Sequence, residues 1–164
     1  MKIKIGLGYD IHRLSRGRDL YLGGIRIPHR SGLVGHSDGD CLIHALIDAL
    51  LGAVGEADIG RRFPDTDPAY EGIRSTGLLR EVMSGLRRRR TRVLNADVVV
   101  VAQAPKLAPH IEAMKKELCP LLGVAKEDLG IKAKTNEGLG LLGRERAVAC
   151  WAVVLVEERK GKRA

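Results

Sequence analysis

Five polar residues in two segments have the types and spacing of metal ligands. Asp10 and His12 lie two apart in an alternating segment, and Asp40, His44 and Asp48 lie four apart in an apolar one. Alternate strand residues share a face, and helix residues four apart share a stripe. One carboxylate and two imidazoles suffice for a catalytic zinc with an open fourth position. With many basic residues elsewhere in the chain, this pattern indicates metal-assisted chemistry on phosphate.

Two elements must bring these residues together. Residues 2–12 alternate between polar and apolar types, which predicts a strand. Its expected buried face carries Ile3, Ile5, Leu7, Tyr9 and Ile11. On the other face Gly6 and Gly8 leave room for a ligand beside the metal-binding residues. The apolar run after residue 40 predicts a buried helix that begins near Ser37, within a sequence that resembles a capping box.

The polar stripe of this helix needs partners, because an unpaired polar group in apolar surroundings costs roughly 1–3 kcal/mol. We expect Asp48 to orient a metal-binding imidazole, since such histidines usually donate their second N–H to a carboxylate. The alternative is that Asp48 binds backbone groups. Imidazole and carboxylate ligands suit zinc, manganese or iron.

Two further segments carry polar groups suited to phosphate. His36 and Ser37 precede the expected helix start, where backbone N–H groups favour an anion. Thr135, Asn136 and Glu137 precede a glycine-rich loop, and Glu137 is suited to hold a magnesium ion against phosphate oxygens.

Composition and charge narrow the class of protein. We expect one domain over residues 1–164, with a frayed basic tail over residues 158–164. A net charge of +8 indicates an anionic partner, either nucleic acid or a small polyphosphate. The aromatic content of 3% argues against base-stacking platforms, and arginines 87–90 are interpreted as a solvated helix end. We therefore expect a small-molecule partner and no nucleic acid.

The sequence predicts a cytoplasmic protein without a membrane partner. The longest apolar run, residues 147–156, is too short to span a bilayer, and the N-terminus does not resemble a signal peptide. The cysteines show no pairing pattern, which favours reduced thiols. They are Cys41, Cys119 and Cys150.

The remaining patterns predict an α+β fold, a single-domain mixed β-sheet with helices packed on one face. A hairpin with a Gly23-Gly24 turn is expected over residues 20–27. Further helices are expected over residues 78–86 and 111–121, and further strands over 93–102, 129–134 and 147–156. Residues 93–134 resemble a βαβ unit.

Six segments, in order along the chain, resemble those of one family. They are Gly8-Tyr9-Asp10-Ile11-His12, His36-Ser37-Asp38-Gly39-Asp40, residues 44–52, residues 58–67, Ala102-Gln103-Ala104-Pro105-Lys106 and Lys132-Ala133-Lys134-Thr135-Asn136-Glu137. The combination is similar to the 2-C-methyl-D-erythritol 2,4-cyclodiphosphate synthase family of the non-mevalonate isoprenoid pathway. The chain departs from some members at Lys134 and Asn136, where they have threonine, and at Glu145-Arg146-Ala147 in a region that lines an axial cavity in relatives.

The resemblance implies a lyase reaction. The 2-phosphate of 4-diphosphocytidyl-2-C-methyl-D-erythritol 2-phosphate would attack the β-phosphate, closing a cyclodiphosphate and releasing CMP. It implies zinc on Asp10, His12 and His44, and Mg²⁺ or Mn²⁺ on Glu137. His36 and Thr135 would stabilise the transition state.

The resemblance also implies where the substrate binds. Residues around the methylerythritol part would be Ser37, Asp58, Ile59, Gly60, Phe63, Pro64, Asp65, Thr66 and Asp67. The cytidine pocket would comprise Ala102, Gln103, Ala104, Pro105, Lys106, Leu107, Ala108, Ala133, Lys134 and Thr135. Other substrate contacts would be Asp10, Ile11, His12, His36, Asn136, Glu137, Leu141 and Arg144. The family forms homotrimers with sites between subunits, so we expect the same here.

Overall fold

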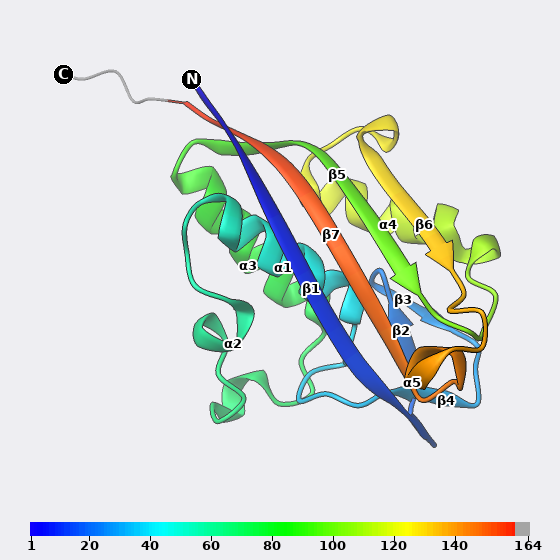
Figure 1. The fold of residues 1–164 in the computed structure, drawn as a ribbon. Coiled ribbons are helices and arrows are strands. Elements are labelled where there is room, and N and C mark those ends of the chain that lie inside the picture. Colours follow the sequence, from blue (N-terminus) through cyan, green and yellow to red (C-terminus); the bar gives the residue numbers. More distant parts are fainter. Residues whose placement is uncertain (160–164) are drawn as a thin grey trace.

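A five-stranded mixed sheet forms the body of the computed structural model, which describes residues 1–159 (Figure 1). The strand order is β4-β1-β7-β5-β6. The strands are β1 (Lys2–Arg16), β4 (Ser31–Leu33), β5 (Thr91–Val101), β6 (Leu129–Lys134) and β7 (Ala147–Glu158). Only the β5–β6 pair among the described strands is parallel, and helix α4 (Ile111–Leu122) connects its two members. This confirms the predicted βαβ unit.

Helices cover one face of this sheet. Helix α1 (Cys41–Ala53) crosses β1 and β7, and α3 (Ser75–Arg88) and α4 lie in the same layer (Figure 1). The predicted α+β class, with helices on one face of a mixed sheet, is therefore confirmed. Shorter elements are α2 (Ile59–Arg62), α5 (Gly140–Gly143) and 3₁₀ turns at Pro68–Tyr70, Ala108–His110 and Lys126–Asp128. Among the described residues, no helix is long and apolar enough to cross a membrane.

The predicted hairpin is present as β2 (Leu20–Leu22) and β3 (Ile25–Ile27). Gly23 and Gly24 form its turn with φ angles of 61° and 81°, a left-handed conformation that favours glycine. The predicted tail is corrected in part, because β7 runs to Glu158 and pairs there with Lys2 of β1. Residues 160–164 lie outside the described part of the chain.

The buried face of β1 is the opposite of the predicted one. The five apolar side chains from Ile3 to Ile11 are exposed, Leu7 to 68% and Ile5 to 69%. Gly6 and Gly8 are buried instead, because helix α1 packs directly on them. The space left by the glycines is therefore filled by a helix and not by a ligand.

The contact between β1 and α1 is made by main-chain atoms. A Cβ built at Gly6 would lie 1.8 Å from the carbonyl oxygen of Ala49, and one at Gly8 would lie 2.0 Å from that of Ala45. Any side chain at either position would force the helix away from the strand. The two glycines therefore set how closely residues 10–12 approach His44.

Gly8→Ala is expected to lower the free energy of unfolding by about 3 kcal/mol, because the added methyl meets a backbone carbonyl that cannot turn aside. Urea unfolding followed by circular dichroism measures this. Gly52→Ala is the matched control, since a Cβ at Gly52 has its nearest contact at 3.9 Å. It should be neutral or stabilising by up to about 1 kcal/mol. Equal unfolding midpoints for the two variants would contradict the packing argument.

Helix α1 begins at Cys41, later than predicted, and its cap is Asp40 rather than Ser37. The Asp40 carboxylate is fully buried and accepts hydrogen bonds from the N–H groups of Ile43, Gly23 and Gly24, at 3.1, 3.0 and 2.7 Å. Backbone N–H groups at the start of the helix and in the β2–β3 turn therefore provide the hydrogen bonds that the buried Asp40 carboxylate requires.

Candidate active site

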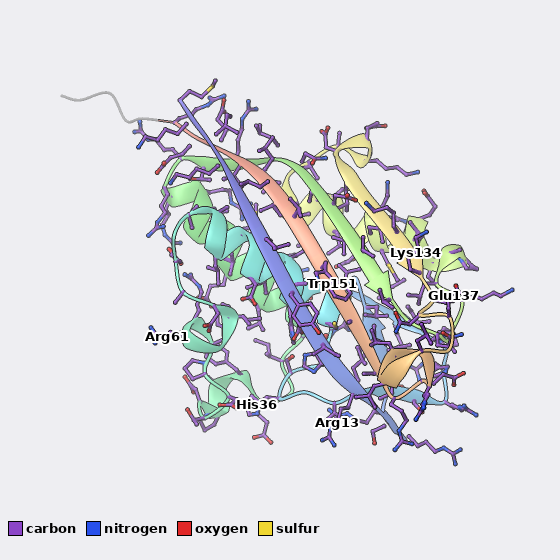
Figure 2. All side chains as sticks on the ribbon, in the orientation of Figure 1. Arg13, His36, Arg61, Lys134, Glu137 and Trp151 are labelled. Carbon is purple, nitrogen blue, oxygen red and sulfur yellow. The ribbon has the colours of Figure 1, made fainter. Side chains whose placement is uncertain are left out.

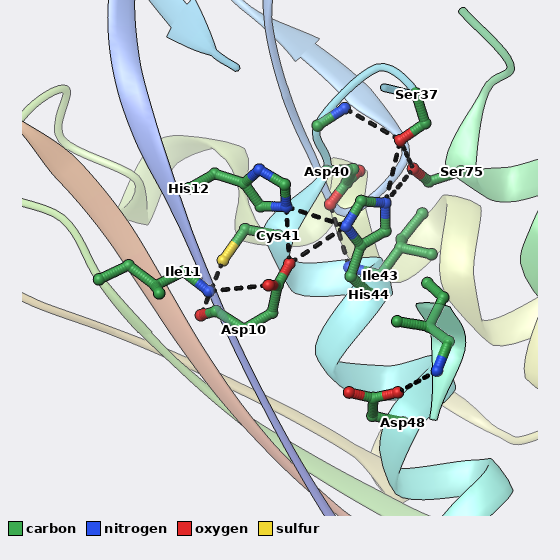
Figure 3. A network of polar contacts seen from close by, with 12 residues as sticks. Asp10, Ile11, His12, Ser37, Asp40, Cys41, Ile43, His44, Asp48 and Ser75 are labelled. Atoms are coloured by element: carbon green, nitrogen blue, oxygen red, sulfur yellow. Dashed lines mark hydrogen bonds and ion pairs between the residues drawn. The ribbon is translucent and has the colours of Figure 1, made fainter. Parts of the chain in front are cut away.

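Asp10, His12 and His44 converge on one point, as their spacing predicts. Asp10 Oδ2 lies 2.9 Å from His12 Nε2 and 3.1 Å from His44 Nδ1, and these nitrogens are 3.1 Å apart (Figure 3). Two of the residues come from β1 and one from the first turns of α1. Strand and helix residues remote in sequence meet because the glycine contacts bring the two backbones together.

The hydrogen bonds of His12 leave one nitrogen free to bind a cation. Its Nδ1 lies 2.5 Å from the carbonyl oxygen of Val34, which can only accept a hydrogen bond. Nδ1 therefore carries the proton of the neutral ring, and Nε2 presents a lone pair toward Asp10. The second ring nitrogen of His44, Nε2, lies 2.9 Å from the hydroxyl oxygen of Ser75 and 3.1 Å from that of Ser37.

The three converging atoms fit a metal ion. When both rings are neutral these atoms direct lone pairs at one another, and either a proton or a metal ion among them relieves the repulsion. Burial opposes ionisation of Asp10, but hydrogen bonds and charge from His12 and His44 outweigh it and hold the pKa of this carboxyl well below its usual range. Burial likewise disfavours charge on His12, yet the Asp10 carboxylate prevails and raises the pKa of the imidazole. The site thus favours positive charge.

Asp48 does not orient His44, so that prediction is wrong. The Asp48 carboxylate accepts a hydrogen bond from Ile59 N at 2.7 Å, and the second nitrogen of His44 faces serine hydroxyls instead. This is the alternative role of a buried group bound to backbone. Burial raises the pKa of Asp48 above its ordinary value, although the Ile59 N–H opposes the shift.

Asp10, His12 and His44 line a cavity of about 290 Å³. Among the predicted substrate-binding residues, it is lined by His36, Ser37, Ile59, Gly60, Phe63 and Asp65, together with the three ligands. Three lining residues were not predicted: Tyr70, Ile73 and Leu78. The first two are hydrophobic residues in a polar segment that follows Pro64 and Pro68, a signal that was available in the sequence.

Other predicted substrate contacts have different surroundings. Asp58 caps α2 and Asp67 caps the turn at Pro68–Tyr70. The Ile11 side chain is 43% exposed on the helix-free face of the sheet, away from the metal ligands. Pro64 and Thr66 lie in the same loop as Phe63 but do not line the cavity. These residues remain predictions for the bound state.

A second cluster gathers where the parallel strands β5 and β6 end. Gln103 Oε1 lies 3.3 Å from Asn136 N and 3.4 Å from Gly138 N, so its side chain ties together the loops after the two strands. Thr135 Oγ1 donates to Glu137 Oε1 at 2.7 Å, and Glu137 has a φ of 49°. A positive φ at a residue with a bulky side chain costs energy and is common at functional sites.

The two clusters do not meet within one chain. Figure 2 shows His36 on the α2 side of the molecule, whereas Lys134, the last residue of β6, and Glu137 lie at the opposite edge. None of residues 102–108 or 133–137 lines the cavity of the metal ligands. The structure therefore separates the predicted cytidine and second-metal residues from the predicted zinc site.

The comparisons with known proteins assign the chain to a family. The model of the YgbB family matches residues 3–157. The chain belongs to the YgbB family. Its match to this family spans the sheet, the helices and both clusters described above.

Two relatives and one solved structure similar to this YgbB-family chain are described as the same synthase. The 2-C-methyl-D-erythritol 2,4-cyclodiphosphate synthase of Thioalkalivibrio sulfidiphilus is 56% identical over 155 residues, which cover 94% of this chain and 97% of that protein. That of Dechloromonas aromatica is 54% identical over 157 residues, covering 96% and 98%. A solved structure of such a synthase in a CDP-bound form aligns with a TM-score of 0.87 and 45% identity, covering 94% of this chain and 100% of that one.

Proposed function

We propose that this chain is a 2-C-methyl-D-erythritol 2,4-cyclodiphosphate synthase. It would convert 4-diphosphocytidyl-2-C-methyl-D-erythritol 2-phosphate to the cyclodiphosphate and CMP. The observation that carries the proposal is the convergence of Asp10, His12 and His44 in the lining of a cavity. Family membership and the names of relatives at 54–56% identity support it. The match over residues 3–157 also supports one synthase domain across residues 1–164.

The reaction joins two parts of one substrate. An oxygen of the 2-phosphate forms a bond to the β-phosphorus, and the bond from this phosphorus to the oxygen bridging it to the α-phosphate breaks, so that CMP leaves. The protein has to align the two phosphates and offset their repulsion, and needs no side-chain nucleophile. His36 and Ser37 line the cavity beside the metal ligands, where each can donate a hydrogen bond to phosphate oxygens.

The metal sites would supply the positive charge. Zinc bound by Asp10, His12 and His44 would offset the negative charge of a substrate phosphate oxygen. Mg²⁺ or Mn²⁺ held by Glu137 would do the same for the α- and β-phosphates. Thr135 fixes the carboxylate of Glu137 through its hydroxyl, and we propose that it also stabilises the transition state.

The cavity walls fit the carbon part of the substrate. Its lining includes the side chains of Ile59, Phe63, Tyr70 and Ile73 as well as Asp10, His12 and His44. A branched five-carbon unit could thus contact apolar side chains while its phosphates face the ligands. The remaining contacts named by family resemblance, including the cytidine pocket over residues 102–108 and 133–135, belong to this proposal.

Assembly into a homotrimer would complete the site. The zinc and cytidine clusters are separate within one chain, and a neighbouring subunit could bring the second cluster to the first. An exposed apolar strip on the helix-free sheet face supports association. The strip comprises Ile3, Ile5, Leu7, Tyr9, Ile11, Trp151 and Val153. Contiguous exposed apolar surface of this kind marks a contact with another protein chain.

The test is incubation of the protein with the cytidine substrate and magnesium, followed by phosphorus NMR. The proposal requires CMP and a cyclic diphosphate in equal amounts. Release of inorganic phosphate would instead indicate a zinc phosphohydrolase that uses water. Absence of both products, together with salt-sensitive binding to nucleic acid, would indicate a basic binding module.

A further inference from the structure

The far side of His44 carries a hydrogen-bonded chain that the reaction does not use directly. Ser75, the first residue of α3, is fully buried and places Oγ 2.9 Å from His44 Nε2 (Figure 3). The same hydroxyl donates to Asp38 Oδ1 at 2.5 Å. The chain therefore runs from Asp38 through Ser75 to the side of the His44 ring opposite the proposed metal.

Asp38 is held as a hydrogen-bond acceptor. Its side chain is only 4% exposed, and its oxygens accept from Arg74 Nε, Ser75 N and Asp40 N at 3.0, 3.1 and 3.2 Å. Arg74 in turn donates to Gly24 O at 2.8 Å and lies over the Tyr21 ring at 4.1 Å. The β2–β3 hairpin and the start of α3 thus fix the carboxylate from several sides.

Counting donors and acceptors assigns the proton on His44. A serine hydroxyl has one hydrogen, and Ser75 gives it to Asp38, an ionised carboxylate that can only accept. Ser75 Oγ can then only accept from His44, so His44 Nε2 carries the proton of the neutral ring. His44 Nδ1 is left with a lone pair, directed at Asp10 Oδ2 and His12 Nε2.

Ser37 alone does not determine which ring nitrogen of His44 carries the proton. Its Oγ lies 3.1 Å from His44 Nε2 and 3.4 Å from Ser75 Oγ, and it accepts a hydrogen bond from Gly39 N at 3.3 Å. The hydrogen of Ser37 has no ionised acceptor to hold it, so this hydroxyl can turn to donate to a bare Nε2 or accept from a protonated one. Both ring forms of His44 are compatible with Ser37.

We propose that Ser75, held by Asp38, is a positioning residue that fixes the Nε2–H form of His44 and so presents Nδ1 to the metal. The inference rests on the metal site of the proposed function. Groups that bind the second nitrogen of a metal-bound histidine typically change metal affinity by 10–100-fold. Here a neutral serine stands between the imidazole and the carboxylate.

Two variants separate this role from plain packing. Ser75→Ala removes the acceptor, and Asp38→Asn supplies an amide that can donate to Ser75 Oγ, freeing the hydroxyl to donate to His44. Ser84→Ala is the matched control, because Ser84 lies on the same helix and is bound to Arg88 instead. Melting temperature and circular dichroism report whether each variant folds.

The first measurement is zinc affinity, by competition with a chromophoric chelator. We expect a 10–100-fold loss for Ser75→Ala and Asp38→Asn and no change for Ser84→Ala. The second is nitrogen NMR of ¹⁵N-histidine-labelled, metal-free protein at alkaline pH, which distinguishes the two neutral ring forms. His44 should be in the Nε2–H form in the parent protein and a mixture of both forms in each of the first two variants.

Unchanged affinity in folded Ser75→Ala, or an Nε2–H form that persists in both variants, would overturn the inference. If Asp38→Asn does not fold, Ser75→Ala alone decides. Failure of the proposed function looks different: the parent protein would then bind zinc no better than His44→Ala does. Neither measurement requires the cyclisation reaction.

Discussion

His44→Ala is expected to abolish zinc binding and to lower turnover by about 10³-fold. A metal that offsets charge on a reacting phosphate contributes several kcal/mol to the transition state, and each 1.36 kcal/mol is a factor of ten in rate. The fold should persist, because the residue lies at the cavity and its loss leaves Asp40 as the cap of α1. Metal analysis of the purified protein and CMP release measure the two effects.

His110→Ala provides the control for this substitution. His110 is the last residue of the 3₁₀ turn that precedes α4 and is not among the residues that line the described cavities. It should keep full metal content and full turnover. Retained turnover in metal-free His44→Ala would show that Asp10, His12 and His44 hold no catalytic metal.

If the proposed homotrimer forms through the apolar strip, Leu7→Glu is expected to dissociate it and to lower turnover by more than 100-fold. Leu7 lies in the middle of the exposed apolar strip and is 68% exposed, so the charge should cost little in a single chain. Between subunits, an unpaired buried charge costs about 3–5 kcal/mol per copy. Because the two clusters are separate within one chain, loss of association should remove activity as well. Sedimentation velocity and CMP release measure both.

Leu7→Met keeps the apolar surface and should leave mass and turnover unchanged. A folded Leu7→Glu protein that retains the parent's sedimentation coefficient would contradict the role of the strip as an interface. Full turnover in a monomeric Leu7→Glu protein would instead show that one chain contains the whole site.

Much of the fold could be predicted because the patterns involved are local. Alternation located β1, the glycine pair located the β2–β3 turn, and helical spacing located α3 and α4. The parallel pairing of β5 and β6 followed from a strand–helix–strand order. These signals depend on neighbours a few residues away in the sequence.

The predictions were wrong where a segment that is distant in the sequence determines which side of an element is buried or which residue caps it. Alternation shows that β1 has two different faces, but the side that receives the helix depends on α1. Gly6 and Gly8 carried that information, since paired small residues permit close backbone packing as readily as they admit a ligand. Likewise, Asp40 became the cap of α1 because its carboxylate also binds the β2–β3 turn.

In the candidate site, too, some features could be predicted from local patterns and others depend on distant segments. The residue types and spacing of Asp10, His12 and His44 predicted that these side chains would form a metal-binding group, and the structure brings them together. The partners of His44 could not be predicted, because Ser37 and Ser75 come from different segments and neither stands in a distinctive pattern. Helical spacing predicts Asp48 as the partner of His44, but the second nitrogen of the imidazole faces Ser75 and Ser37, and Asp48 binds Ile59 N.

The glycine contacts between β1 and α1 have a lasting consequence for how this protein can evolve. Where a carbonyl oxygen touches a strand Cα, no side-chain rotamer intervenes between the two elements. Mutations that resize Leu, Ile or Val elsewhere in the interior can shift neighbouring helices while the span from strand to helix stays constant. Asp10, His12 and His44 would thereby keep their spacing through extensive sequence drift in the core.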